Sequence, residues 1–336
     1  MIRRLPLVAL LGLLLAPAWA HGQIAELKFA AFPPPQGALI QDVLGPWTKD
    51  VNEALKGTVN IRLFPGGTLG RDPVQQYKLV RDRVVDIVYV VQGYTPGDFP
   101  DATILELPFL IENSLEGSVG HWRMHERGLM RGYDKVKVLG LFSIPPQSLH
   151  ASVKLTRIED LKGLKIRSAG PYQSAAIELL GGTPVSGIPV PQAAEAISRG
   201  VVQGVLSDWN GMIAFRISDA VKYHYEVPIG TAAAGIFMNL EAFNALPQAA
   251  KAAIESRSNQ VLSRLHGIEF DKRYRENLEK TKAEKDRTFT FPSAAERADI
   301  KRRLQPITDR WIQENPEGRK RYDAFVAIVD DIRKGR

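Results

Sequence analysis

The sequence predicts an α/β protein with two lobes and a long helix that runs across both. Two segments, residues 59–94 and 164–210, each begin with a short strand pattern and contain a Gly-Gly-Thr turn and a helical stretch. Each ends in Val-Val and an apolar strand, and apolar strands separated by helices indicate parallel sheets covered on both faces. The long helix is predicted from Pro247, which opens a helical run from about 248 to 285. A chain of 336 residues is long enough for two such lobes.

The first twenty residues have the composition of a secretory signal peptide. Arg3 and Arg4 precede an apolar run over 5–16, and Ala18 and Ala20 form an A-x-A cleavage pattern. The apolar run is shorter than the ~20 residues that a membrane span needs, which favours a cleaved leader over an anchor. We therefore expect residues 1–20 to be a signal peptide cleaved after about Ala20, and the mature chain to be exported.

The later elements follow in order along the chain. Residues 24–147 are expected to form lobe 1, with a contribution from about 230–260. Residues 148–229 are expected to form lobe 2, with a contribution from about 261–320. The segment 235–243 has the pattern of a strand that enters a turn. Two amphipathic helices are predicted at about 294–313 and 318–334, so that 321–336 is a C-terminal helix or tail.

Composition excludes several classes of function. The chain contains no cysteine, which rules out thiol catalysis, cysteine zinc sites and iron–sulfur clusters. The formal net charge of +7 falls to about +5 without Arg3 and Arg4. Basic residues at 272–287 and 301–303 lie on predicted helices that also carry Glu and Asp, so no nucleic-acid partner is expected. A mildly basic surface can instead attract small anions.

Polar and aromatic side chains follow the predicted strands at the points where those strands end. In α/β sheets, ligands gather beyond the carboxyl ends of the strands. This rule marks five candidate ligand-binding residues: Gln92, Tyr94, Ser207, Asp208 and Trp209. Trp209, Tyr94 and Phe32 could together form an aromatic wall for an organic ligand, although core packing is the alternative, above all for Phe32. The three prolines within 31–40 either set one rim of a cleft or merely stiffen a connection.

Arg167 also follows a short apolar strand, and a small-residue turn and a helix come after it. Its planar guanidinium matches the two oxygens of a carboxylate, which Lys cannot do. The alternative is a structural salt bridge to Asp160 or Glu159. The position alone does not decide between these two roles.

No motif indicates catalysis or a cofactor. His121 and His125 have helical i, i+4 spacing but lack the glutamate of a zinc protease, so no metal is expected. The Gly-rich stretches lack the phosphate-loop and dinucleotide patterns, and G-x-S-x-G is missing. We therefore expect a binding protein that is not an enzyme.

Six motifs occur in an order typical of one family: "LFPGGTLG", "VVDIVYV", "FPDATILELPFL", "IEDLKGLKIR", "LGGTPV" and "MN" at 238–239. Together they resemble the extracytoplasmic, dicarboxylate-binding-protein-like solute-binding subunits of tripartite ATP-independent periplasmic (TRAP) transporters. The resemblance extends from about Ile24 to Lys320. It implies a periplasmic-binding-protein-like fold with a ligand cleft between two lobes and a long helix that spans them.

The resemblance also implies a role for particular residues. The arginine that ends "IEDLKGLKIR", here Arg167, would grip an organic acid, and Asn239 of the "MN" motif is a further candidate contact. Sialic-acid members carry a second arginine twenty residues before the first, where this chain has Gln147. They also have asparagine where Ser207 stands here. These departures argue against sialic acid and for a monocarboxylate, and Trp209 argues for an apolar or aromatic tail.

The function that the resemblance implies is capture of a small carboxylate in the periplasm. The loaded protein would deliver it to the large and small membrane subunits of a permease driven by an ion gradient. Two alternatives use the same cleft: an exported enzyme, for which no acid–base pair is found, and a sensor that presents its closed form to a receptor. Which organic acid is bound does not follow from the sequence.

Overall fold

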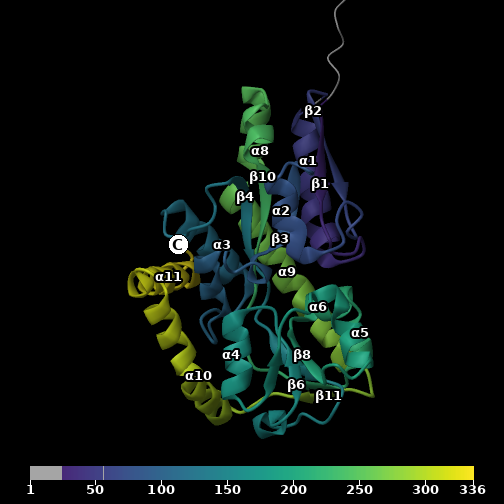
Figure 1. The fold of residues 1–336 in the computed structure, drawn as a ribbon, viewed down its shortest axis with the longest axis vertical. Coiled ribbons are helices and arrows are strands. Elements are labelled where there is room, and N and C mark those ends of the chain that lie inside the picture. The colour runs from purple at the N-terminus through teal and green to yellow at the C-terminus, as the bar shows by residue number, and fades with distance from the viewer. Residues whose placement is uncertain (1–24, 56) are drawn as a thin grey trace, which may run out of the picture.

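The computed structural model describes residues 25–55 and 57–336, which form two α/β lobes connected by several crossings of the chain (Figure 1). The predicted signal peptide lies outside these residues. The first lobe is built on a five-stranded sheet, ordered β2 (Val59–Phe64), β1 (Ala25–Ala30), β3 (Ile87–Val91), β10 (Ala233–Asn239) and β4 (Val136–Ser143). β2, β1 and β3 are parallel, whereas β10 runs antiparallel to both of its neighbours.

The second lobe contains a six-stranded sheet. Its order is β11 (Thr288–Thr290), β9 (Tyr223–Tyr225), β5 (Ser148–Ala151), β8 (Gly204–Ser207), β6 (Lys165–Arg167) and β7 (Thr183–Val185). β8, β6 and β7 are parallel, and β5 is antiparallel to β8 and β9. The two similar sequence segments correspond only in part, because Thr183 of the second Gly-Gly-Thr begins strand β7, whereas Thr68 of the first lies in a turn.

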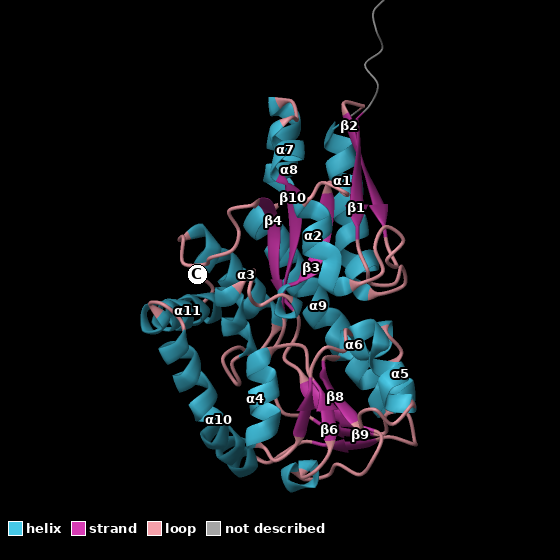
Figure 2. Cartoon of the chain, in the orientation of Figure 1, coloured by secondary structure: helices cyan, strands magenta, loops and turns pink. Residues whose placement is uncertain are grey.

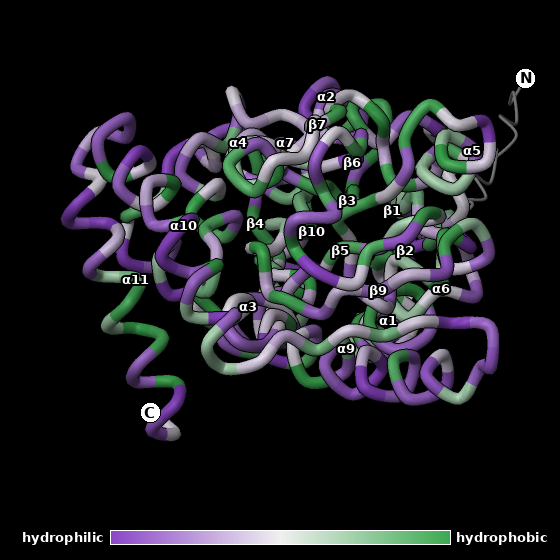
Figure 3. Tube along the Cα trace, turned by 90° about the horizontal axis from the view of Figure 1, so that it is seen from below, coloured by the Kyte–Doolittle hydropathy of each residue, from purple (hydrophilic) through white to green (hydrophobic). Residues whose placement is uncertain are grey.

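Helices cover both sheets, as Figure 2 shows. Those of the first lobe are α1 (Gly45–Leu55), α2 (Gln76–Arg81), α3 (Ser114–Glu126), α7 (Leu240–Asn244) and α8 (Gln248–Arg257). Those of the second lobe are α4 (Pro171–Leu179), α5 (Ala193–Ser198) and α6 (Trp209–Ala214). β3 is buried along its whole length; Val88 and Val90 face one core cluster while Ile87 and Tyr89 face another. This alternation is what a strand covered on both sides requires. In Figure 3 the outer helices α10 and α11 alternate between hydrophilic and hydrophobic residues, as helices with one face on the protein do.

The predicted helix over 248–285 is wrong in one respect, because the chain breaks at Ser258 into α8 and α9 (Asn259–Lys282). Asn259 adopts φ 64°, a left-handed conformation that asparagine tolerates better than most residues. The Trp47 indole N–H donates to the Arg257 carbonyl oxygen at 3.0 Å, so a carbonyl at the end of α8 keeps a partner. α9 packs on α3 and β4 of the first lobe and on α6 of the second, and therefore spans both lobes.

Two extended segments, 144–147 and 226–232, also run between the sheets, and we call them the hinge segments. The Gln147 N–H donates to the Gly230 carbonyl oxygen at 2.9 Å, and the Ile229 N–H donates back to the Gln147 carbonyl oxygen at 2.9 Å. The Ile144 N–H donates to the Ala232 carbonyl oxygen at 3.1 Å. These three backbone hydrogen bonds hold the hinge segments side by side between the lobes.

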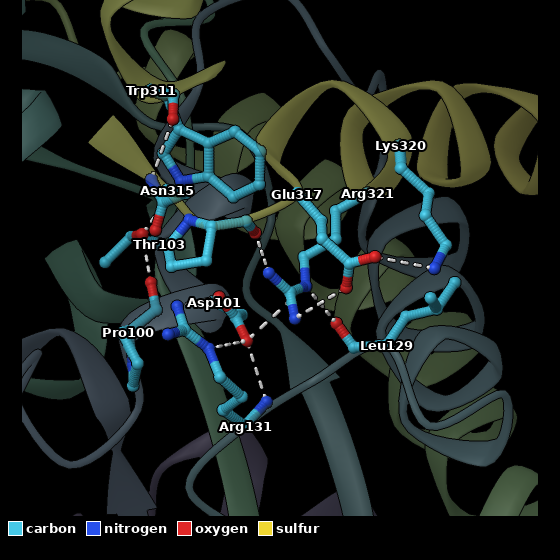
Figure 4. Close-up of polar contacts among 11 residues, drawn as sticks. Pro100, Asp101, Thr103, Leu129, Arg131, Trp311, Asn315, Glu317, Lys320 and Arg321 are labelled. Carbon is cyan, nitrogen blue, oxygen red and sulfur yellow. Dashed lines mark hydrogen bonds and ion pairs between the residues drawn. The ribbon is translucent and has the colours of Figure 1, made fainter. Parts of the chain in front are cut away.

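The C-terminal helices α10 (Ala294–Glu314) and α11 (Gly318–Arg333) pack on both lobes. α10 contacts α4, and α11 contacts α3. Figure 4 shows the attachment: the fully buried Asp101 accepts bonds from the Arg131 guanidinium at 2.6 and 2.8 Å and lies 3.7 Å from Arg321 of α11. Beside it, the Trp311 indole N–H donates to the Thr103 hydroxyl at 2.9 Å. No helix of the described residues is both long and apolar enough to cross a membrane.

Gly267 lets α9 approach α3 closely, and this contact provides a test of the packing. A Cβ atom there would lie 2.5 Å from the Leu115 Cα, a backbone atom that cannot easily move. We expect Gly267→Ala to lower the free energy of unfolding by about 1–3 kcal/mol, despite the better helix propensity of alanine. Thermal unfolding would measure this. Arg264→Ala on the exposed side of α9 is the control, expected within about 0.5 kcal/mol of wild type; equal melting temperatures would contradict the close approach.

Candidate functional site

A cavity lies between the two lobes, and both sheets and α9 contribute to its walls. The space in it that the centres of water molecules can occupy measures about 80 Å³, several times the ~10–15 Å³ that one water needs. Its aromatic lining residues are Phe32, Tyr89 and Tyr94 of the first lobe, Phe215 of the second and Phe270 of α9. Four polar lining residues keep hydrogen-bonding atoms that the protein does not fully use: Gln147, Arg167, Ser207 and Asp208.

Arg167 ends β6 and is 1% exposed, yet its side chain lines the cavity. Its Nε donates to the Ile188 carbonyl oxygen at 2.8 Å, and one Nη donates to the Tyr94 hydroxyl at 3.2 Å. No carboxylate of the described residues lies within 4 Å of the guanidinium. The predicted salt-bridge alternative is therefore wrong: Asp160 accepts from Thr156 and Arg157, and Glu159 lies near Arg157 and Arg303. A buried cation without a counter-ion is costly, which favours an anion from outside.

Tyr94 connects the lobes at this point. It belongs to the turn after β3 in the first lobe, and its hydroxyl accepts from Arg167 and, at 2.9 Å, from the Val190 N–H of the second lobe. The phenol therefore orients the guanidinium and ties lobe 1 to the loop that precedes α5. Arg167 and Tyr94 were both predicted at strand ends, and the fold brings them together.

The walls of the cavity are apolar and aromatic. The Phe32 ring lies 5.6 Å from Tyr89 and 6.3 Å from Phe215, nearly parallel to the latter, so that aromatic rings of the two lobes meet. The proline-rich loop contributes Pro33 to the lining, as one of its two interpretations expected. Such walls suit a flat apolar ligand better than a sugar.

Asp208, Ser207 and Gln147 form the polar end of the cavity. Asp208 caps α6, with its Oδ1 accepting the Asn210 and Gly211 N–H groups at 2.9 and 3.2 Å. Burial raises the pKa of Asp208 to about 6. Gln147 accepts from the Gln173 side-chain amide at 2.6 Å. The carboxyl ends of β6 and β8 place these groups and Arg167 on one edge of the second sheet.

A buried carboxyl group lies behind the cavity, where the lobes join. Glu106, in the 3₁₀ helix over Pro100–Glu106 of the first lobe, accepts the Tyr172 N–H at the start of α4 at 2.9 Å. Its carboxyl lies against the backbone of Gly170, where a Cβ would be 2.0 Å from Oε1. Burial raises the pKa of Glu106 to about 8. This carboxyl thus holds the turn that follows Arg167 against the first lobe.

Three predicted ligand-binding residues do not line the cavity. Trp209, predicted as a pocket wall, is fully buried in the second lobe, and its indole N–H donates to Glu226 at 3.0 Å. Its ring packs against His150, His224 and Phe289. As the first residue of α6, it points back into the core while Asp208 before it faces the cavity.

Gln92 and Asn239 are the other two. Gln92 is buried, and its amide donates to the Tyr133 hydroxyl at 2.6 Å, because the turn after β3 directs Tyr94 rather than Gln92 toward the second lobe. Asn239 caps α7 and donates to the Val80 carbonyl oxygen at 2.9 Å. Since β10 is antiparallel to β3, the end of β10 lies at the opposite edge of the sheet from the cavity.

Sequence reasoning missed Tyr89, Phe215 and Phe270. Phe270 follows Leu262 and His266 at helical i, i+4 spacing, so the periodicity of the long helix could have indicated its inward face. Tyr89 lies within an apolar strand and gave no separate signal. His121 of the "HWRMH" pattern bonds to the Tyr133 hydroxyl at 2.8 Å, and the described residues contain no cluster of three potential metal ligands.

Comparison with known proteins identifies the family. Residues 29–315 match the family described as bacterial extracellular solute-binding protein, family 7. The chain belongs to this family. Two crystal structures of TRAP solute-binding proteins are 27% identical to it, and each comparison covers 92% of this chain and 99% of the other. One, from Rhodoferax ferrireducens with copurified benzoate, has a TM-score of 0.87; the other, from a marine metagenome and specific for aromatic acids, contains 3-hydroxybenzoate and has a TM-score of 0.86.

A more distant TRAP protein has a similar fold. The protein from Bordetella bronchiseptica with bound mandelate is 22% identical, with a TM-score of 0.83 over 92% of this chain and 99% of that chain. The predicted resemblance to TRAP solute-binding subunits and the two-lobed fold are thus confirmed. Family 7 proteins are transport receptors rather than enzymes, which agrees with the lack of catalytic motifs.

Proposed function

We propose that this protein captures an aromatic or otherwise apolar monocarboxylate in the periplasm and delivers it to the membrane subunits of a TRAP permease. The observation that carries the proposal is the buried Arg167 guanidinium, which faces an aromatic cavity without a carboxylate partner among the described residues. The 27%-identical relatives that hold benzoate and 3-hydroxybenzoate support the same ligand class. Family membership supports a periplasmic site of action after removal of the signal peptide.

The proposed mechanism starts with the lobes apart. The carboxylate enters and pairs with Arg167 of the second lobe, and the ring of the ligand contacts Phe215 of the same lobe. The lobes then close about the hinge segments, which brings Tyr94 onto Arg167 and Phe32 onto the ligand ring. Closure removes water, lowers the local dielectric constant and strengthens the ion pair. The closed, loaded form is the one that the permease subunits would recognise.

A ligand screen by thermal unfolding tests this function. Benzoate, phenylacetate, succinate and a sugar acid would each be added to the mature protein. We expect the aromatic monocarboxylates to stabilise it most, since a ligand at one hundred times its Kd adds ~2.7 kcal/mol. Calorimetric titration would then give Kd and a stoichiometry of one. Stabilisation by succinate or the sugar acid alone would refute the proposed ligand class.

A further inference from the structure

The two oxygens of the Asp208 carboxylate have different surroundings. Oδ1 accepts two backbone N–H groups at the start of α6. Oδ2 accepts no hydrogen bond from any described residue, although Asp208 is only 4% exposed and lines the cavity. Oδ2 is not one of the sealed side-chain atoms that lack a partner, so water in the cavity can reach it, and a donor group on a ligand can replace that water.

Neighbouring donors are already engaged. The Asn210 side-chain amide donates to the Phe270 carbonyl oxygen at 2.9 Å, and its oxygen accepts from Asn277 at 3.0 Å. The Trp209 indole N–H donates to Glu226 on the far side. The Ser207 hydroxyl is 3.4 Å from the Asp208 backbone oxygen. Rearrangement of these groups toward Oδ2 would break the bonds they make.

Strand register separates Asp208 from Arg167. Arg167 of β6 pairs with Val205 of β8, and Asp208 follows Val205 by three residues. At ~3.3 Å per residue, the Asp208 backbone lies about 10 Å farther along the strand direction. Gln147 lies one residue before the Ser148–Ser207 pair, so it is next to Asp208. A ligand whose carboxylate meets Arg167 can therefore extend along the edge of the sheet toward Asp208.

We propose that Asp208 is a specificity-determining residue, whose Oδ2 accepts a hydrogen bond from a hydroxyl group on the ligand away from the ligand carboxylate. The ligand class is then a hydroxylated aromatic acid. The inference rests on the proposed function, because it assumes that an aromatic acid pairs with Arg167. A neutral hydroxyl fits better than an ammonium group, since desolvating a second cation in an apolar cavity is costly.

Titration calorimetry at pH 8 would test this with 3- and 4-hydroxybenzoate and their methyl analogues, which have similar shapes but no donor. We expect wild type to bind the better hydroxybenzoate at least tenfold more tightly than its methyl analogue, a difference of ~1.4 kcal/mol. In Asp208→Asn the ratio should fall below about threefold, because the amide replaces the acceptor with a donor. Asparagine caps helices as well as aspartate, so α6 should persist. If Asp208→Asn does not fold, Asp208→Ser is measured in its place, because serine also caps helices.

The possible outcomes separate this inference from the proposed function. If wild type binds methyl- and hydroxybenzoates equally well, hydroxyl recognition is refuted while the proposed function stands. If Asp208→Asn keeps the full preference for hydroxybenzoate over methylbenzoate, another group recognises the hydroxyl and Asp208 does not. Tighter binding of 3-(aminomethyl)benzoate than of either hydroxybenzoate would refute the hydroxyl and indicate that Asp208 accepts from an ammonium group on the ligand instead. If none of these acids binds, the proposed function itself fails.

Discussion

Replacing Arg167 with alanine should weaken binding of an aromatic monocarboxylate by at least tenfold, and by about a hundredfold if both carboxylate oxygens are held. The expectation follows from hydrogen bonds to charged groups, which contribute about 1.5–3 kcal/mol. Arg167→Lys should recover only part of the loss. Lysine retains the charge, but it cannot bond to the Ile188 carbonyl oxygen, the Tyr94 hydroxyl and a ligand in one plane.

Calorimetric titration of the folded variants measures this effect. Arg199→Ala is a matched control, because Arg199 is an exposed arginine of the same lobe, paired with Glu195 outside the cavity. Its affinity should equal that of wild type. Unfolding without ligand shows whether Arg167→Ala disturbs the lobe itself. Unchanged affinity in a folded Arg167→Ala variant would mean that the ligand carboxylate binds elsewhere.

Glu106→Gln should make the protein more stable than wild type at pH 8 but not at pH 5. The pKa of the buried Glu106 is raised to about 8, so the folded protein holds this proton more tightly than the unfolded chain. At low pH, both states are protonated and the carboxyl carries no penalty. As pH rises from about 4.5 to about 8, only the unfolded chain loses the proton, so wild-type stability falls by up to ~1.4 kcal/mol per pH unit. Glutamine does not titrate, and so avoids this loss.

The measurement is the difference in free energy of unfolding between variant and wild type at pH 5, 6.5 and 8. Taking this difference removes the contribution of other buried carboxyls to the pH dependence of stability. These include Asp208 and Glu226, whose pKa values burial raises to about 6 and about 7. Glu178→Gln, an exposed change on α4, the helix whose first turn bonds to Glu106, should show no such trend. A difference that stays constant with pH would mean that Glu106 is ionised throughout. Above pH 8 the advantage should level off.

The strand-end rule selected residues of the second sheet that line the cavity, because that rule is local; their contact with a ligand stays a prediction. Arg167, Ser207 and Asp208 follow strands that are parallel to one another, so their ends meet at one edge. The same rule failed for Asn239, since the sequence of β10 does not reveal that it runs antiparallel in the first sheet. It also failed for Trp209 and Gln92, because a one-residue step around a turn redirects a side chain from cavity to core.

Sequence by itself determined the α/β class, the family, and Arg167 as the candidate clamp. These depend on hydrophobic periodicity and on short motifs, which are properties of neighbouring residues. Only the tertiary structure decided three contacts. Among residues 25–55 and 57–336, Arg167 has no acidic partner and one oxygen of Asp208 accepts no hydrogen bond, and Phe32 meets Phe215 across the lobes. These are contacts between segments far apart in the sequence, and they exist only once packing has fixed strand direction, register and the rotation of each helix.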